Sequence, residues 1–218
     1  MKNQIYELVS INVGMPKNMT YQGEVISTGI DKQPIAKPIF LFKTGLEGDG
    51  QADLVHHGGE DKAICVYPYV HYSYWAKELK RTLSYGAFGE NLTVDGLTEE
   101  VVCIGDVYEL GEALVQVTQP RQPCHKLAKK HNEIYLPKWV QDSGYTGFYF
   151  RVLREGWVSG EKSMKLVERH PKNVTVAYAN RMMHHEKANI EGMKRILEVE
   201  ELSLSWRETF TKRVANGG

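Results

Sequence analysis

The sequence has few cysteines and no long apolar run. Only three of its 218 residues are cysteine, at the widely spaced positions Cys65, Cys103 and Cys124. A sparse, odd-numbered set does not form the disulfide framework of a small secreted domain. We therefore expect a reducing, cytoplasmic compartment. The N-terminus lacks a signal-peptide core and no run of about 18 apolar residues exists, so we expect neither export by a standard signal nor a membrane span.

The sequence also has no excess charge of either sign. It contains 27 Lys and Arg residues against 27 Asp and Glu residues. Proteins that hold nucleic acid by bulk electrostatics carry a basic excess, so a nucleic-acid partner is not expected. The hydrophobic fraction of 42% and the charged fraction of 25% are ordinary for a globular chain. The length allows one large domain, or a main domain with an appendage.

Short β-branched and aromatic runs fill the first 160 residues, and Gly or Pro bounds each of them. These runs predict strands at 5–14, 37–45, 63–67, 113–120 and 147–158. Two helices are expected among them, at 68–80 with Pro68 in the first turn, and at 124–132. The connections are too short for a regular parallel α/β fold. The pattern therefore predicts a mainly β barrel or sandwich with a few short helices.

Helical periodicity replaces this pattern from Thr175 onward. Apolar residues recur at helical spacing in 175–185, 189–199 and 203–214. Thr175 and Asn189 are expected to cap the first two helices, and Ser205 with Glu208 has capping-box spacing. Helices this short are marginal alone, so they must pack together. We predict a main β domain over 1–160 and a three-helix bundle over 161–218.

The stretch "VTQPRQPCHKLAKK" places Cys124 in a stiff and basic setting. Pro120 and Pro123 fix the local backbone, while Arg121 precedes the thiol and four titratable side chains follow it. Cationic neighbours favour the thiolate, which is the nucleophilic and metal-binding form. A half-buried cysteine in a basic loop is the alternative. Cys65 in "AICVY" and Cys103 in "VVCIG" lie in apolar contexts and are expected to be inert core residues.

Two further segments carry groups that suit a polar ligand. In "HHGGEDKAI", Gly58 and Gly59 permit close backbone approach, and with Lys62 they are candidates for an anion nest. A plain turn explains the two glycines as well. In "GAFGENLTVDGL", Glu90 and Asn91 follow two glycines and offer acceptors and donors. A glycine-rich loop capped by Asn91 is the alternative.

Taken in order, three segments resemble the MOSC domain, named for the C-terminal domain of molybdenum-cofactor sulfurases. They are "GDGQADLVHHGGEDKAICVYPYVHY", "FGENLTVDGLTE" and "VCIGDVYELGEALVQVTQPRQPCHKL". The resemblance covers about residues 30–160. The tail from "HPKNVTVAYANRMM" onward is similar to the three-helix domain of the bacterial YiiM-type branch, which is linked to resistance to 6-hydroxylaminopurine. The resemblance implies a MOSC-type β-barrel with a C-terminal three-helix bundle.

The resemblance also implies a cofactor and a reaction. It places the family's cysteine on Cys124, as catalytic residue and molybdenum ligand of a bound molybdenum cofactor (molybdopterin). The cofactor-binding residues that it suggests are His57, Gly58, Gly59, Lys62, Glu90, Asn91 and Arg121. The expected activity is a cofactor-dependent oxidoreductase that reduces N-hydroxylated bases or amines. The chain has no dinucleotide fingerprint and no iron–sulfur cysteine set, so an external redox partner is expected. A homodimer is left open.

Two other functions stay open at this point. The first is a carrier that holds the cofactor, or sulfur as a Cys124 persulfide, and hands it on. The second is a hydrolase that uses the Cys124 thiol with a histidine base. His125 is a poor base for it because adjacent residues of an extended chain point to opposite sides, so His57 or His131 would be required.

Overall fold

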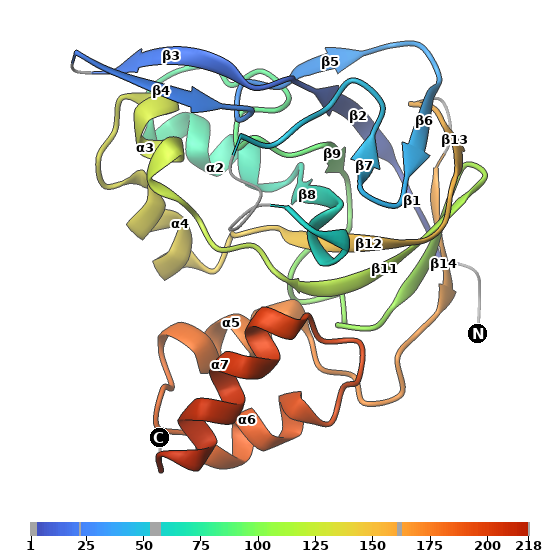
Figure 1. Cartoon of the computed structure of the whole chain (residues 1–218), viewed down its shortest axis with the longest axis vertical. Helices are drawn as coiled ribbons and strands as arrows, with labels where there is room; N and C mark the ends of the chain where they lie inside the picture. Colours follow the sequence, from blue (N-terminus) through green and yellow to red (C-terminus); the bar gives the residue numbers. More distant parts are fainter. Residues whose placement is uncertain (1–3, 22, 53–57, 161–162, 218) are drawn as a thin grey trace.

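The main body of the fold is a nine-stranded sheet that curls into a half-barrel (Figure 1). The computed structural model describes residues 4–21, 23–52, 58–160 and 163–217. In their order across the sheet, the strands are β1 (Ile5–Tyr6), β14 (Met164–Glu168), β10 (Val107–Leu110), β11 (Ala113–Pro120), β12 (Phe148–Arg154), β8 (Ile64–Pro68), β9 (Leu92–Val94), β2 (Leu8–Val13) and β5 (Gln33–Ile35). Neighbours pair antiparallel except β8 and β9, which are parallel. The expected mainly β fold is confirmed.

Two smaller β elements complete this part of the chain. A three-stranded sheet consists of β13 (Gly156–Val158), β6 (Ile39–Phe42) and β7 (Gly45–Leu46). Leu41 and Leu46 from this sheet pack into one apolar core with Phe148 and Phe150 of the large sheet. A hairpin of β3 (Lys17–Tyr21) and β4 (Glu24–Thr28) extends from the body (Figure 1). Its strands are largely exposed and polar, so they lack the apolar alternation that identifies a strand in a sequence.

A 3-10 helix and three α-helices lie among these strands. They are η1 (Glu60–Lys62), α2 (His71–Glu78), α3 (His125–His131) and α4 (Leu136–Ser143). A second core packs Trp75 of α2, Leu127 of α3 and Leu136 of α4 together with Tyr67 of β8. Pro68 ends β8 instead of opening the helix after it, which corrects the expected first-turn role. The sequence analysis did not predict α4, in which Pro137 occupies the first turn, where a proline is tolerated.

The C-terminal three-helix bundle forms as predicted. Its helices are α5 (Val176–His184), α6 (Ile190–Leu197) and α7 (Leu204–Ala215). The Thr175 and Asn189 side chains accept from the backbone N–H groups of residues 178 and 192, which confirms both caps. The expected capping box in α7 is wrong. Ser203 is the N-cap residue and makes no side-chain cap, while Ser205 lies inside the helix, where its hydroxyl donates to the Gln119 side chain (3.4 Å).

Several hydrogen bonds fix the bundle to the half-barrel. The Ser203 backbone N–H donates to the Thr118 carbonyl (3.1 Å), and the Asn180 amide donates to the Thr146 hydroxyl (2.7 Å). Val176, the first residue of α5, belongs to the main core. The sheet itself continues past residue 160, because β14 lies between β1 and β10. A cut at the expected boundary would therefore remove a strand from the half-barrel.

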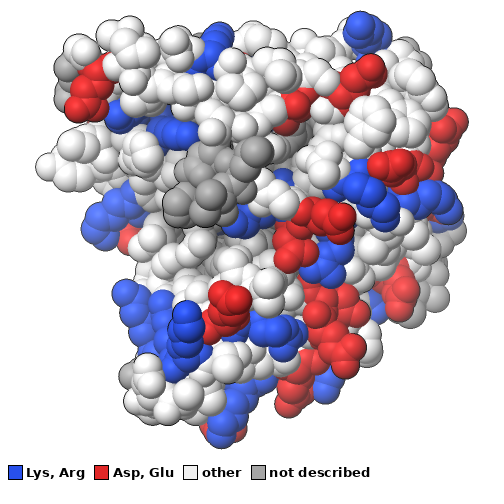
Figure 2. Space-filling view, viewed as in Figure 1, with Lys and Arg blue, Asp and Glu red and all other residues white. Residues whose placement is uncertain are grey.

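Charges of both signs are mixed over the surface. Figure 2 shows Lys and Arg side chains gathered at one side of the C-terminal helices, and Asp and Glu side chains at the other. The visible face therefore carries no single-sign field, in agreement with the balanced composition. Among the described residues, no helix has both the length and the apolar composition that crossing a membrane requires.

Candidate functional site

A pocket opens where the start of α3 meets β8 and β12. It encloses about 600 Å³, its open mouth included. Its described lining residues come from separate stretches of the chain: Thr28–Ile30, Lys32, Gly50–Ala52, Lys62, Cys65, Gly89, Asn91, Arg121, Gln122, Cys124, Lys126 and Tyr149. The pocket therefore exists only in the folded chain, and Cys124 lies in its wall.

The described wall of this pocket is basic. Four cationic side chains line it, namely Lys32, Lys62, Arg121 and Lys126, and no described lining residue is acidic. The charge of Lys32 is balanced by Asp49, with which it forms a buried ion pair. Charges of one sign in a concave site with low-dielectric walls focus their field into the cavity. The pocket is suited to an anionic ligand.

The backbone around Cys124 holds the thiol at the pocket wall. Cys124 follows the end of β11 and takes an extended conformation as the N-cap residue of α3. Its carbonyl accepts from the Leu127 N–H (3.0 Å), and the residue is half-buried. The stiff Pro-flanked segment thus carries the chain from the sheet into a helix, with the thiol at the junction.

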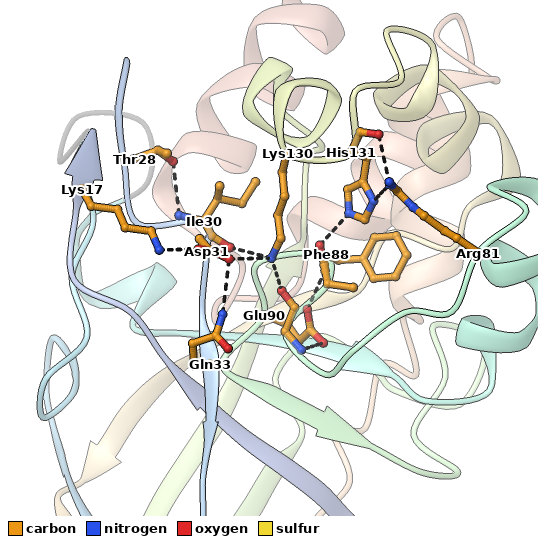
Figure 3. A network of polar contacts seen from close by, with 12 residues as sticks. Lys17, Thr28, Ile30, Asp31, Gln33, Arg81, Phe88, Glu90, Lys130 and His131 are labelled. Carbon is orange, nitrogen blue, oxygen red and sulfur yellow. Dashed lines mark hydrogen bonds and ion pairs between the residues drawn. The ribbon is translucent and has the colours of Figure 1, made fainter. Parts of the chain in front are cut away.

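The other end of α3 is tied to two loops next to the pocket through Lys130 (Figure 3). The Lys130 ammonium donates to the carbonyls of Ile30 (3.1 Å) and Gly86 (2.7 Å). Ile30 lines the pocket, and Gly86 opens the loop that contains the lining residue Gly89. Burial lowers the pKa of Lys130. Because one short helix joins Cys124 to these loops, its anchoring fixes the thiol relative to the lining residues Ile30 and Gly89.

His131 completes this anchor and has no capacity left for catalysis. Its Nε2–H donates to the Ala87 carbonyl (2.8 Å), and its Nδ1 accepts from Arg81 (Figure 3). Burial lowers the pKa of this imidazole to about 4, so it is neutral at physiological pH. Both ring nitrogens are engaged away from the thiol. This geometry removes His131 as the base of a Cys124 hydrolase.

Arg121 contributes an unpaired donor to the wall. Its backbone N–H donates to the Gly147 carbonyl (3.0 Å), and its Nη2 donates to the Phe88 carbonyl (2.6 Å). The residue is only 5% exposed, yet among the described residues its Nη1 has no hydrogen-bond partner. Burial alone would lower the pKa of this guanidinium, but the neighbouring Cys65, Tyr149 and Cys124 groups raise it above its usual value. The guanidinium therefore contributes a permanent positive charge to the pocket wall, and its buried Nη1 has no acceptor among the described residues.

The glycine pair is placed differently from the expected anion nest. Gly59 has a φ of +94° and precedes η1, as expected of a glycine that permits an unusual backbone. Neither Gly58 nor Gly59 is among the residues that line the pocket, whereas Lys62, three residues on, does line it. His57 lies outside the described residues.

Glu90 stabilises a loop and does not face the pocket, which corrects the expectation that it contacts a ligand. The residue is fully buried. Its carboxylate accepts from the Tyr72 and Thr93 hydroxyls and from the backbone N–H groups of Gly86 and Phe88. Three of these bonds are to Oε1, and the Phe88 N–H bond is to Oε2. The carboxylate therefore sets the conformation of the glycine-rich loop that carries Gly89 into the wall.

Asn91 lines the pocket with its amide already engaged. Its Oδ1 accepts from the Cys65 N–H (3.1 Å), and its Nδ2 donates to Asp49 (2.8 Å) and to the Asn12 carbonyl (3.3 Å). Asp49 also accepts from the Gly14 N–H (2.8 Å). Asn91 thus positions β8 in the wall.

The sequence analysis missed several lining residues. Lys126 is one of the basic residues after Cys124, so its presence in the wall was within reach of the sequence. Tyr149 and Cys65 alternate with core residues in strands. The local sequence does not distinguish them from the core residues beside them. They are opposite one another in the β8–β12 pairing. Only the register of two strands far apart in sequence brings them to the pocket.

Comparison with known proteins finds two matching domain families and several similar proteins. The profile of the MOSC domain matches residues 53–165, and that of the YiiM-like, 3-alpha helix domain matches residues 174–217. The uncharacterized protein YflK of Bacillus subtilis is 53% identical over 98% of this chain and 96% of its own length. The crystal structure of YiiM from Geobacillus stearothermophilus has a TM-score of 0.82 at 47% identity, covering 96% of this chain and 99% of that one. A protein of Gibberella moniliformis called "Reductase" is 35% identical to this chain. The match covers 76% of this chain and 30% of the length of that protein.

Proposed function

Since the chain belongs to the MOSC domain family and carries the YiiM-like three-helix domain, we propose that it binds the molybdenum cofactor beside Cys124 and reduces N-hydroxylated bases or amines. The observation that carries the proposal is the unpaired Nη1 of buried Arg121 in the wall that also holds Cys124. A buried donor without an acceptor costs about 1–3 kcal/mol, and more when it is charged. A small displacement of the Arg121 side chain toward an anionic group in the pocket would recover that energy.

The residues present fit the cofactor's two chemical ends. Arg121 offers a planar fork suited to phosphate, and Lys62 and Lys126 add positive charge to the same wall. Cys124 offers a thiol, and soft thiolate ligands suit a soft metal centre. The molybdenum cofactor, when bound, supplies the two-electron reduction of the N–O bond. The chain's own contribution is to hold the anion, aim the thiol through α3 and confine the substrate in the pocket.

The proposed reaction class rests on a relative's name, and the proposed redox partner rests on the motifs that the sequence lacks. The relative called "Reductase" supports reduction as the reaction class. Electrons would come from an external redox protein, since the sequence carries no motif for a second cofactor. The three cysteines are free thiols, which suits a reducing, cytoplasmic compartment.

A second candidate function is a carrier of sulfur or of the cofactor. The observation that favours it is the half-buried position of the Cys124 thiol in a basic pocket, where a persulfide anion would be stabilised. Turnover separates the two functions. A reductase needs molybdenum and an electron donor, whereas a sulfur carrier needs only the thiol.

The test is reduction of 6-hydroxylaminopurine by protein purified from a molybdenum-replete host, with reduced viologen as the artificial electron donor. We expect turnover to adenine by the wild type and none by Cys124→Ala. Cys103→Ala is the matched control because Cys103 is buried beside Arg169, outside the pocket lining. Cys124→Ala that is folded by circular dichroism and reduces substrate at the wild-type rate would contradict the proposal. Sulfur transfer from a persulfide-loaded wild type that shows no turnover would favour the carrier.

A further inference from the structure

The last helix of the C-terminal bundle is capped by a side chain of the β domain. Ser203 is the N-cap residue of α7, and its own side chain makes no cap hydrogen bond within the described part of the chain. The Asp61 Oδ2 accepts instead from the Leu204 N–H (3.1 Å). A carboxylate at a helix N-terminus satisfies a free backbone donor and is favoured by the helix dipole. The start of α7 is therefore bound to η1, 143 positions earlier in the chain.

The same carboxylate is bound to the large sheet. Its Oδ1 accepts from the Arg151 Nε (3.0 Å) and Nη2 (2.6 Å), and the Arg151 Nη2 also donates to the Glu201 carbonyl (3.0 Å). The Asp61 carbonyl accepts from the Thr118 hydroxyl (2.7 Å). Asp61 thus joins η1 to β12, to β11 and to the bundle at a single point.

The turn that carries Asp61 also carries a residue of the pocket wall. η1 is a single 3-10 turn with no buried residue, and the bonds within it run from the Lys62 N–H to the Gly59 carbonyl (3.0 Å) and from the Ala63 N–H to the Glu60 carbonyl (3.3 Å). A turn this short with 3-10 geometry contributes little stability of its own. Lys62 directly follows Asp61 and lines the pocket. The place of its charge in the wall therefore depends on how η1 is held.

We propose that Asp61 is a positioning residue for the pocket. By binding the start of α7 and Arg151, it holds η1 so that Lys62 stays in the wall. The bundle then supports the pocket from outside, since none of the described lining residues belongs to it. The inference rests on the proposed function only in treating the pocket as an anion site.

Electrostatics alone predicts the opposite effect of removing Asp61. A carboxylate near a basic pocket repels an anionic ligand, so loss of its charge should strengthen anion binding. A positioning role predicts weaker binding, because Lys62 is no longer held in the wall. The sign of the change in affinity therefore separates the two roles.

The experiment measures the affinity of the full-length apoprotein for inorganic pyrophosphate by isothermal titration calorimetry at low salt. Asp61→Asn keeps the shape of the side chain but turns an amide N–H toward the donors of Arg151. Leu204→Pro removes only the N–H that Asp61 binds. Proline is tolerated at the first position of a helix, the Leu204 side chain is 64% exposed, and Ser203 has a ψ of 148°, which suits a residue before proline.

The matched control is Glu60→Gln. Glu60 is the adjacent acidic residue of the same turn and is exposed, so the change removes one negative charge and leaves the Asp61 contacts in place. We expect Asp61→Asn and Leu204→Pro each to weaken pyrophosphate binding about three- to tenfold. Glu60→Gln should leave it unchanged or slightly tighter. Combined with Lys62→Ala, neither of the first two changes should weaken binding by more than about a further twofold, because the lysine through which they act is gone.

Unchanged or tighter binding by either Asp61→Asn or Leu204→Pro would overturn the proposal, as would an equal loss with and without Lys62. Should Asp61→Asn fail to fold, Leu204→Pro decides alone, because it leaves the ion pair with Arg151 intact. A wild type that binds no pyrophosphate would overturn the anion site and both proposals with it. A wild type that binds pyrophosphate beside variants that bind it equally well would overturn this inference alone.

Discussion

Replacing Arg121 by methionine separates a binding role from a structural one. In the apoprotein the change removes the Nη2 bond to the Phe88 carbonyl, and a bond to a charged group contributes about 1.5–3 kcal/mol. It also removes Nη1, whose burial without a partner costs about 1–3 kcal/mol. The two effects oppose one another. We therefore expect the free energy of unfolding of the apoprotein to change by no more than about 2 kcal/mol.

Cofactor binding has no such compensation. Loss of a charge-assisted bond to an anion costs about 1.5–3 kcal/mol, which weakens binding about ten- to a hundredfold. Arg121→Lys should also weaken it, because lysine keeps the charge but not the planar fork. Urea unfolding of the apoproteins measures stability. Molybdenum content by mass spectrometry, with released pterin measured by fluorescence, reports occupancy per folded chain.

Arg169→Met is the matched control, because Arg169 forms an ion pair with buried Asp106 (2.8 Å) and does not line the pocket. It should lower stability and leave occupancy per folded chain unchanged. The reasoning is refuted if Arg121→Met destabilises the apoprotein by well over about 3 kcal/mol while its folded fraction binds cofactor as the wild type does. Arg121 would then be a structural residue only, and the anion site would lie elsewhere.

Two further predictions concern the groups that hold the pocket together. Burial lowers the folded-state pKa of His131 to about 4 from the ordinary value of 6.5. As the pH falls, the unfolded chain therefore binds the proton before the folded chain does. The stability of the wild type should decline between about pH 6.5 and pH 4. At about 1.4 kcal/mol per pKa unit, the wild type should lose about 3 kcal/mol of stability over this pH range relative to His131→Gln. The glutamine amide keeps both hydrogen bonds but does not titrate. A stability difference between the two proteins that does not vary with pH would contradict the prediction. Asp49→Ala should cost about 3–5 kcal/mol in urea unfolding because it leaves Lys32 buried and unpaired, while the double variant with Lys32→Met should cost less. A double variant less stable than Asp49→Ala would show that the ion pair is not the cause.

The strands and helices that the sequence predicted share one property. Each has an apolar face in the core and a Gly, Pro or capping residue at its end, as Thr175 and Asn189 illustrate. The exposed hairpin of β3 and β4 has no such face, so local pattern does not reveal it. β14 lies beyond residue 160, where we expected the β domain to end, and its pairing with β1 and β10 shows that it belongs to the half-barrel.

The candidate site was predictable where its residues are neighbours in sequence. Arg121 and Cys124 share one Pro-flanked segment, and their basic setting is visible there. Glu90 was misjudged because a carboxylate beside glycines has the same sequence appearance whether it faces a ligand or, as here, backbone N–H groups of its own loop. Cys65 reaches the wall through strand register, which the sequence alone does not provide.

The measurement that tests the central claim most directly is the molybdenum and pterin content of the purified chain, with Cys124→Ala prepared in parallel from the same molybdenum-replete host. The account predicts molybdenum and pterin in equal amounts, close to one of each per wild-type chain. It predicts that Cys124→Ala, with the basic wall intact, loses molybdenum while it stays folded. A folded wild type that contains neither molybdenum nor pterin would contradict the account.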